Sequence, residues 1–159
     1  MENKVLNIAL VAHDSRKTEL IDWCKHNLQW LSQQNLYATG TTAKLLSQIT
    51  YPVVEQGVEF NLNLYVTKLL SGPLGGDQQI GAMIAEGKID VLIFFCDNLI
   101  TQGHHQDVGA LVRLASLYNI AFATNRTTAD MLITSSLINS AEYERIIPNV
   151  IQSYKNRQL

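Results

Sequence analysis

Short apolar runs that alternate with amphipathic stretches are the feature of this chain that most limits its fold. The run Val91–Cys96 is apolar throughout, which is typical of a central parallel strand covered on both faces. Similar short runs lie at Asn7–Ala12, Leu36–Ala38, Val66–Leu70 and Ile120–Ala123. This order of strands and helices predicts one α/β domain, with a parallel central sheet of about five strands and helices on both faces.

Helices are expected between these strands, because apolar residues recur there at a spacing of three and four. They are expected over residues 17–31, 41–49, 78–85 and 107–118. A last helix, capped by Thr127 or Thr128, is expected to run through Leu132.

The segment 51–65 breaks this rhythm, because it is too long for a simple connection. Val58, Phe60, Leu62 and Leu64 alternate with polar residues, which indicates a half-buried strand, and Gln56 with Gly57 suits the turn of a hairpin. We interpret the segment as an inserted ribbon or extended edge whose apolar face would suit a subunit contact. The alternative is that it only lengthens the strand that follows.

Composition excludes several classes of function. The 159 residues carry a formal net charge of −2 and no basic tract, which argues against nucleic-acid or anionic-membrane binding. The longest apolar run is far too short to span a bilayer, and the first residues lack the apolar core of a signal peptide. Cys24 and Cys96 form no metal-binding spacing, so no metal site is expected and the cytoplasm is the expected compartment.

Polar residues follow every predicted strand. The groups, in chain order, are His13, Asp14 and Lys17; Thr39–Thr42; Ser71–Asp77; Asp97, His104 and Asp107; and Thr124 with Asn125. Because the carboxyl ends of parallel strands meet at one edge of a sheet, we expect these groups to form a single ligand site there.

Two of these groups suit a phosphate. Thr39–Thr42 opens a helix, so its hydroxyls and N–H groups can bind an anion, and Lys17 can add a positive charge. The run Ser71–Gln79 has three glycines that leave N–H groups accessible to an anion. Within it, Asp77 is either an acid–base group or only the N-cap of the following helix. The chain lacks GxxxxGK[ST] and GxGxxG, so neither a nucleoside triphosphate nor a dinucleotide is indicated.

The remaining groups suit proton transfer. His13 and His104 are candidate acid–base or polarising residues, although each could instead be a structural histidine. An aspartate with an ordinary pKa is a weak base toward carbon, so we expect the pKa of at least one aspartate in the cluster to be perturbed. Its aspartates are Asp14, Asp77, Asp97 and Asp107.

These blocks together resemble the methylglyoxal synthase family, over almost the whole chain apart from 51–65. The matching runs are Ala9–Asp14, Leu36–Thr42, Leu70–Gln79, Glu86–Phe95, Ala123–Asn125 and Thr128–Asp130. The resemblance implies a Rossmann-like sheet and a lyase that converts dihydroxyacetone phosphate to methylglyoxal and inorganic phosphate. It also implies no metal or organic cofactor, a homohexamer, and inhibition by phosphate.

The resemblance also implies residue roles. Asp77 matches the catalytic base, and His104, Asp107 and Asp14 match other active-site residues. The substrate-binding and phosphate-binding positions are His13, Lys17, Thr39, Gly40, Thr41, Thr42, Ser71, Gly72 and Arg157, the last reaching a neighbouring subunit. Asp97-Asn98-Leu99 and Gly103–Asp107 carry fewer prolines than the family pattern, so a looser loop is expected there.

Other functions remain open at this point. A regulatory module of the same fold, as in the carboxy-terminal domain of the large subunit of carbamoyl phosphate synthetase, would explain Thr39–Thr42 without requiring Asp77, His104 and Asp107. A sugar-phosphate isomerase or lyase would use the same kinds of residue. A bare scaffold would make the polar clusters coincidental.

Overall fold

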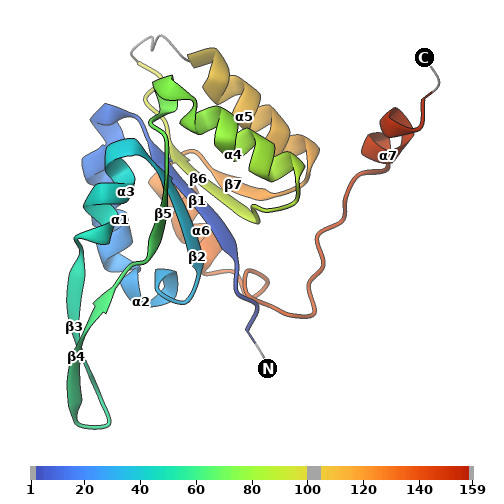
Figure 1. Cartoon of the computed structure of the whole chain (residues 1–159). Helices are drawn as coiled ribbons and strands as arrows, with labels where there is room; N and C mark the ends of the chain where they lie inside the picture. Colours follow the sequence, from blue (N-terminus) through green and yellow to red (C-terminus); the bar gives the residue numbers. More distant parts are fainter. Residues whose placement is uncertain (1–2, 100–104, 158–159) are drawn as a thin grey trace.

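A computed structural model describes residues 3–99 and 105–157 (Figure 1). Its central sheet has five strands in the order β5-β2-β1-β6-β7, and every neighbouring pair is parallel. The strands are β1 (Asn7–Ala12), β2 (Asn35–Thr39), β5 (Val66–Leu69), β6 (Val91–Phe95) and β7 (Ala121–Ala123). The predicted parallel sheet is therefore confirmed, with β1 at its centre.

Helices cover both faces of this sheet, because side chains along each central strand point alternately to either side. Ile8 and Leu10 of β1 pack in one core cluster with Trp23 and Leu46, whereas Ala9 and Val11 pack in a second. The helices are α1 (Lys17–His26), α2 (Leu28–Leu31), α3 (Gly40–Ser47), α4 (Gly76–Ala85), α5 (His105–Leu117), α6 (Arg126–Ile133) and α7 (Asn149–Lys155). None of the described helices combines the length and apolar character that crossing a membrane requires.

Several helix boundaries differ from the predicted ones by one or two residues, and two larger differences have a local cause. The helix expected over 17–31 breaks at Asn27, whose side-chain amide donates to the carbonyl of Trp23 at 2.8 Å and so ends α1. The N-cap of α6 is Asn125 rather than Thr127 or Thr128, because the Asn125 side chain accepts the N–H of Thr128 at 2.9 Å.

The segment between α3 and β5 forms an antiparallel hairpin outside the main sheet. Its strands are β3 (Thr50–Glu55) and β4 (Val58–Asn63), and they turn at Gln56 and Gly57, both with positive φ. The hairpin projects away from the body of the molecule (Figure 1).

The carboxy-terminal segment also leaves the body. After α6 and a short turn, residues 143–148 have no regular secondary structure and lead to α7, which stands apart from the sheet (Figure 1). Arg157 follows α7, and its guanidinium stacks on the ring of Tyr154 at 3.6 Å from the ring centroid.

Gly76 sits where two connections of the sheet pass closest to each other. A Cβ atom built on Gly76 would lie 2.0 Å from the carbonyl oxygen of Leu70 and 2.8 Å from Cγ2 of Thr39. Only a residue without a side chain allows the start of α4 to pack against the ends of β5 and β2.

Replacing Gly76 with alanine should therefore destabilise the fold. Because the new methyl group meets backbone atoms, we expect the free energy of unfolding to fall by about 2–3 kcal/mol. Gly109 is the matched control, since it lies within α5 with nothing inside 4 Å of its Cβ position. Gly109→Ala should raise stability by about 0.5–1 kcal/mol through helix propensity. Urea unfolding of both variants measures the difference, and equal effects would contradict the packing argument.

Candidate active site

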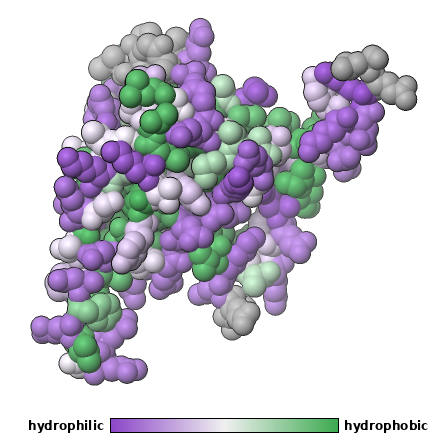
Figure 2. Space-filling view, in the orientation of Figure 1, coloured by the Kyte–Doolittle hydropathy of each residue, from purple (hydrophilic) through white to green (hydrophobic). Residues whose placement is uncertain are grey.

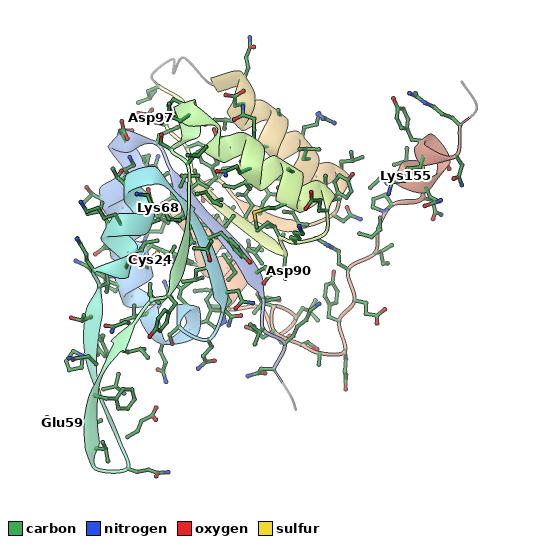
Figure 3. All side chains as sticks on the ribbon, in the orientation of Figure 1. Cys24, Glu59, Lys68, Asp90, Asp97 and Lys155 are labelled. Atoms are coloured by element: carbon green, nitrogen blue, oxygen red, sulfur yellow. The ribbon has the colours of Figure 1, made fainter. Side chains whose placement is uncertain are left out.

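A cavity of about 700 Å³ opens at the carboxyl ends of the parallel strands. Figure 3 marks this edge by Asp97, just beyond β6, and the opposite edge by Asp90. The cavity wall brings together ten of the residues predicted from sequence, namely His13, Asp14, Lys17, Thr39, Gly40, Thr41, Ser71, Gly72, Asp77 and Asp107. Val11, Ala12, Pro73 and Phe94 complete it.

The connections after β2 and β5 form one side of this cavity. Gly40 begins α3 with φ +49°, and a Cβ atom there would lie 3.0 Å from Cβ of Ser71. Glycine thus lets the two loops touch, so that Thr39–Thr41 and Ser71–Gly72 face the same space. The first N–H groups of α3 have no partner within the helix, which makes this end suited to an anion.

Lys17 supplies the positive charge beside these loops. Its ammonium group donates to a carboxylate oxygen of Asp14 at 2.6 Å and to the hydroxyl of Thr41 at 2.8 Å. The contact to Thr41 fixes Lys17 at the mouth of the α3 helix end. The Asp14 side chain is 93% exposed, so this ion pair is weak and an anion can compete with it.

Asp77 lies in the first turn of α4 and is only 3% exposed. The N-cap of α4 is Gly75, which lies in the left-handed region and has no side chain with which to cap the helix. The interpretation of Asp77 as the N-cap is therefore wrong. Its carboxyl group instead forms part of the cavity wall, at the positive end of the α4 dipole.

The N–H groups of Gly75 and Gly76 form hydrogen bonds with the backbone of their own turn. The N–H of Gly75 donates to the carbonyl of Gly72 at 3.0 Å, and the N–H of Gly76 donates to the carbonyl of Ser71 at 2.9 Å. These bonds correct the expectation that the Gly75 and Gly76 N–H groups are accessible to an anion. The glycines act by conformation, since they place Asp77 beside Ser71 and Gly72.

His13 is buried, and a backbone bond determines its tautomer. The N–H of Asp97 donates to Nδ1 of His13 at 2.7 Å, and the ring packs edge-on against Phe94 with centroids 5.2 Å apart. Because Nδ1 accepts a hydrogen bond, a neutral ring carries its proton on Nε2. His13 thus has an N–H donor on the nitrogen that does not face Asp97.

Sequence reasoning missed the contacts that fix this histidine. Asp97 accepts the Ser15 hydroxyl on Oδ2 at 2.5 Å and the N–H of Leu99 on Oδ1 at 2.9 Å, and Arg16 donates to the carbonyl of Cys96 at 3.2 Å. Asp97 therefore ties the loop after β6 to the turn after β1. The position of Asp97 after a strand was a signal, but its partner could not be read from the sequence.

Three predicted site residues are not placed in the cavity. Thr42 is fully buried behind its wall, so its hydroxyl does not face the cavity. Arg157 lies beyond α7, away from the cavity of its own chain. His104 lies outside the described residues, as do residues 100–103 of the loop expected to be looser.

The residues that line this cavity, rather than its volume, identify it as the candidate active site. A second cavity, of about 660 Å³, lies at the opposite edge of the sheet, near Asp90. There the Asp90 carboxylate accepts the N–H of Asn7, and Arg145 donates to the carbonyl of Ile89. Both charged groups thus form hydrogen bonds with the backbone of the protein itself. Within residues 3–99 and 105–157, no cluster of three or more His, Cys, Asp or Glu side chains could hold a metal ion.

Comparison with known proteins agrees with this architecture. The MGS-like domain family model matches residues 19–124. Methylglyoxal synthase from Maridesulfovibrio salexigens is 52% identical over 163 residues, covering 99% of each chain, and that from Proteus mirabilis is 51% identical, covering 95% of this chain and 91% of the other. A crystal structure of methylglyoxal synthase from Elizabethkingia anophelis matches with a TM-score of 0.81 and 39% identity, over 98% of this chain and 93% of the other.

The fold and these matches define a class of protein, namely Rossmann-like α/β enzymes whose cavity lies at the carboxyl edge of a parallel sheet. The chain belongs to the methylglyoxal synthase family, and it is a lyase.

Cys96 offers a probe of charge in the cavity. Burial raises the pKa of its thiol to about 11; the positive charge of Arg16 opposes this rise, and the negative charge of Asp77 adds to it. Thiolate is the reactive form, so alkylation of Cys96 should be slow at pH 8 and speed up as pH approaches 11.

Asp77→Asn removes one of the charges that raise this pKa, so it should shift the alkylation curve to lower pH. Burial also raises the pKa of Cys24, which serves as an internal control that stays unreactive in both proteins. Mass spectrometry of alkylated peptides distinguishes the two thiols. An unshifted Cys96 curve would mean that Asp77 carries no charge that Cys96 senses.

Proposed function

We propose that this enzyme converts dihydroxyacetone phosphate to methylglyoxal and inorganic phosphate. The observation that carries the proposal is one cavity in which a buried carboxyl group, Asp77, lies beside two loops and a lysine suited to a phosphate. A carbon acid with a phosphate leaving group needs both parts. The names of the relatives support the same reaction.

The phosphate of the substrate would be held by the loops after β2 and β5. The N–H groups at the start of α3, the hydroxyls of Thr41 and Ser71, and the ammonium of Lys17 surround this part of the cavity. Binding exchanges the Lys17–Asp14 ion pair for a Lys17–phosphate pair, which leaves Asp14 to solvent. Free phosphate fits the same position, so we expect it to inhibit.

Asp77 would remove a proton from C3, leaving an enediolate with negative charge on the C2 oxygen. The C3 hydroxyl then loses its proton and becomes the aldehyde as the double bond shifts to C1–C2. The C1–O bond breaks, and its electron pair leaves with phosphate. The product is an enolate with its charge on the C2 oxygen, and it takes up a proton at C1, which forms the C2 carbonyl and the methyl group of methylglyoxal.

The charge that develops on C2 oxygen requires a donor in the cavity. A neutral His13 with its proton on Nε2 is suited to this role, because it donates without transferring a full positive charge. His104 is proposed as a second donor, and Asp107, in the cavity wall, as an acid–base partner in the later proton transfers.

Elimination also needs a particular geometry. The C1–O bond must overlap the π system of the enediolate, so the phosphate has to lie out of the enediolate plane. An isomerase that forms the same intermediate holds its phosphate near that plane. We propose that Thr39–Thr41 and Ser71 hold it out of plane, with the reacting carbons within reach of Asp77.

Replacing Asp77 with asparagine tests the base. We expect turnover of dihydroxyacetone phosphate to fall by at least ~10²-fold, because an amide cannot accept the C3 proton. Methylglyoxal and phosphate should be measured together, since a regulatory module would make neither and an isomerase would release no phosphate.

Asp130→Asn is the matched control for this variant. Asp130 lies on α6 outside the cavity wall, and its acceptor contact to the Trp23 indole is preserved by asparagine. Asp130→Asn should keep normal turnover. Near-normal turnover in Asp77→Asn would show that another group is the base.

We further propose that the enzyme is a homo-oligomer, a hexamer by family resemblance, in which Arg157 completes a neighbouring site. Arg157 lies beyond the arm that carries α7 away from the body, so it is poorly placed to reach the cavity of its own chain. Its guanidinium is suited to bind phosphate with two parallel hydrogen bonds.

Arg157→Ala should raise KM for dihydroxyacetone phosphate by at least about tenfold, because a charge-assisted hydrogen bond is lost. Mixed oligomers of Arg157→Ala and Asp77→Asn chains should recover part of the activity, since some sites then receive an intact Asp77 from one chain and an intact Arg157 from another. If mixing restores nothing, Arg157 does not act across subunits.

A further inference from the structure

The two faces of the β3–β4 hairpin differ in chemistry. Residues paired across the strands share a face, and one face carries the pairs Tyr51–Leu62, Val53–Phe60 and Glu55–Val58. The other face carries the pairs Thr50–Asn63, Pro52–Asn61 and Val54–Glu59. We call the first the apolar face; its only charged residue, Glu55, lies at the tip.

Much of the apolar face is open to solvent in the single chain. Tyr51 is 56% exposed, Val58 is 63% and Phe60 is 40%. Only Leu62, at the base, packs against the core cluster. Figure 2 shows apolar residues among hydrophilic ones on the projecting hairpin. An isolated two-stranded ribbon is marginally stable in water, so this face gains from a partner.

The apolar face continues into a hollow at the base of the hairpin. This hollow, of about 360 Å³, is lined by Lys25, His26, Leu28, Ile49, Thr50 and Tyr51. Tyr51 belongs to both surfaces, and Thr50 brings the edge of the opposite face to the same hollow. The walls of the hollow are partly apolar, and Lys25 supplies a positive charge there. The ring of His26 lies in the same wall, with Nδ1 3.5 Å from a carboxylate oxygen of Asp22.

The tip of the hairpin has the complementary character. Glu55 and Glu59 flank the turn, with Val58 between them on the apolar face, and Figure 3 shows Glu59 near the tip. The ribbon thus has an acidic tip, an apolar middle and, at its base, a hollow that carries the ammonium group of Lys25. A surface whose two ends complement each other fits a second copy of itself, turned end to end.

We infer that the apolar faces of two hairpins pack against each other about a twofold axis, between two copies of this chain. The pair Val53–Phe60 lies at the middle of the face, so it would meet its own copy near the axis. Each tip, with Glu55 and Val58, would reach the hollow of the other chain beside Lys25 and His26. One symmetric contact would then pair the tip of each hairpin with the hollow of the other chain.

The size of this contact limits its strength. A six-residue strand spans about 20 Å, so a ribbon two strands wide offers roughly 200 Å² per copy. Stable interfaces bury at least about 1,200 Å² in total. The hairpin contact should therefore be weak alone, and it should join copies that also associate elsewhere or are concentrated. Its charged ends should make it sensitive to salt.

Phe60→Glu and Asn61→Glu test the contact as a matched pair. These neighbouring residues lie on opposite faces of β4, so the same charge enters the same strand on either side. Sedimentation velocity over a range of concentrations should show association weakened by at least about tenfold in Phe60→Glu, because like charges meet at the axis. Asn61→Glu should associate normally, and thermal unfolding should confirm that both variants fold.

A charge exchange tests the antiparallel arrangement. Glu55→Lys and Lys25→Glu should each weaken association, and the double variant should restore it, because the pair is re-formed with opposite signs. Val53→Cys should form a disulfide-linked dimer, whereas Asn61→Cys should not, and both native cysteines are buried.

The inference is overturned if Phe60→Glu and Asn61→Glu associate equally. It is also overturned if Val53→Cys fails to cross-link at concentrations where the chain associates. Restored association without Val53→Cys cross-linking would place Glu55 near Lys25 in an arrangement other than the face-to-face one. None of these measurements depends on catalytic activity, so they stand apart from the proposed reaction.

Discussion

Parallel hydrogen bonding of β1 to β2 on one side and to β6 on the other is the constraint on which the rest of the structure depends. Ile8–Ala12 pairs in register with Val91–Phe95, and Asn7–Leu10 pairs with Asn35–Ala38. A parallel strand needs a crossover after it, and helices on both faces leave no face for polar residues. The central strands β1 and β6 are therefore apolar along almost their whole length, and polar side chains follow them at their ends. The carboxyl ends of the parallel strands all open at one edge. The cavity follows from this geometry.

Much of the fold could be predicted from the sequence, because the spacing of apolar residues and the position of turn residues are local features. The apolar run Val91–Cys96 and the spacing of Leu20, Trp23 and Cys24 reveal a buried strand and a helix face without any knowledge of partners. Helix ends were less predictable. Threonine and asparagine are both common N-cap residue types, so the sequence alone does not distinguish Thr127 from Asn125. Asn125 is the N-cap because it adopts an extended backbone after β7.

The site was predicted as a group of residues but not as a set of contacts. Strand ends indicated that His13, Lys17 and Asp77 would meet. They could not indicate that Asp97 would bind the His13 ring through its N–H, since these residues are 84 positions apart. Nor could they show that the Gly75 and Gly76 N–H groups close their own turn. Such contacts depend on three-dimensional packing, which leaves no short-range signal.

The two segments outside the sheet differ in what they require of a partner. The arm with α7 carries a cation, Arg157, and the hairpin carries an apolar face with charged ends. Arg157 calls for an anion, but the arm also exposes apolar side chains, since Ile146 is 79% exposed, Val150 60% and Tyr154 62%. An exposed apolar face gains free energy whenever it is covered, and its polar reverse face and acidic tip limit which surface can cover it. We therefore propose that both segments take part in assembly of this chain, the hairpin through its apolar face and the arm through its exposed apolar residues, with Arg157 directed to a neighbouring site.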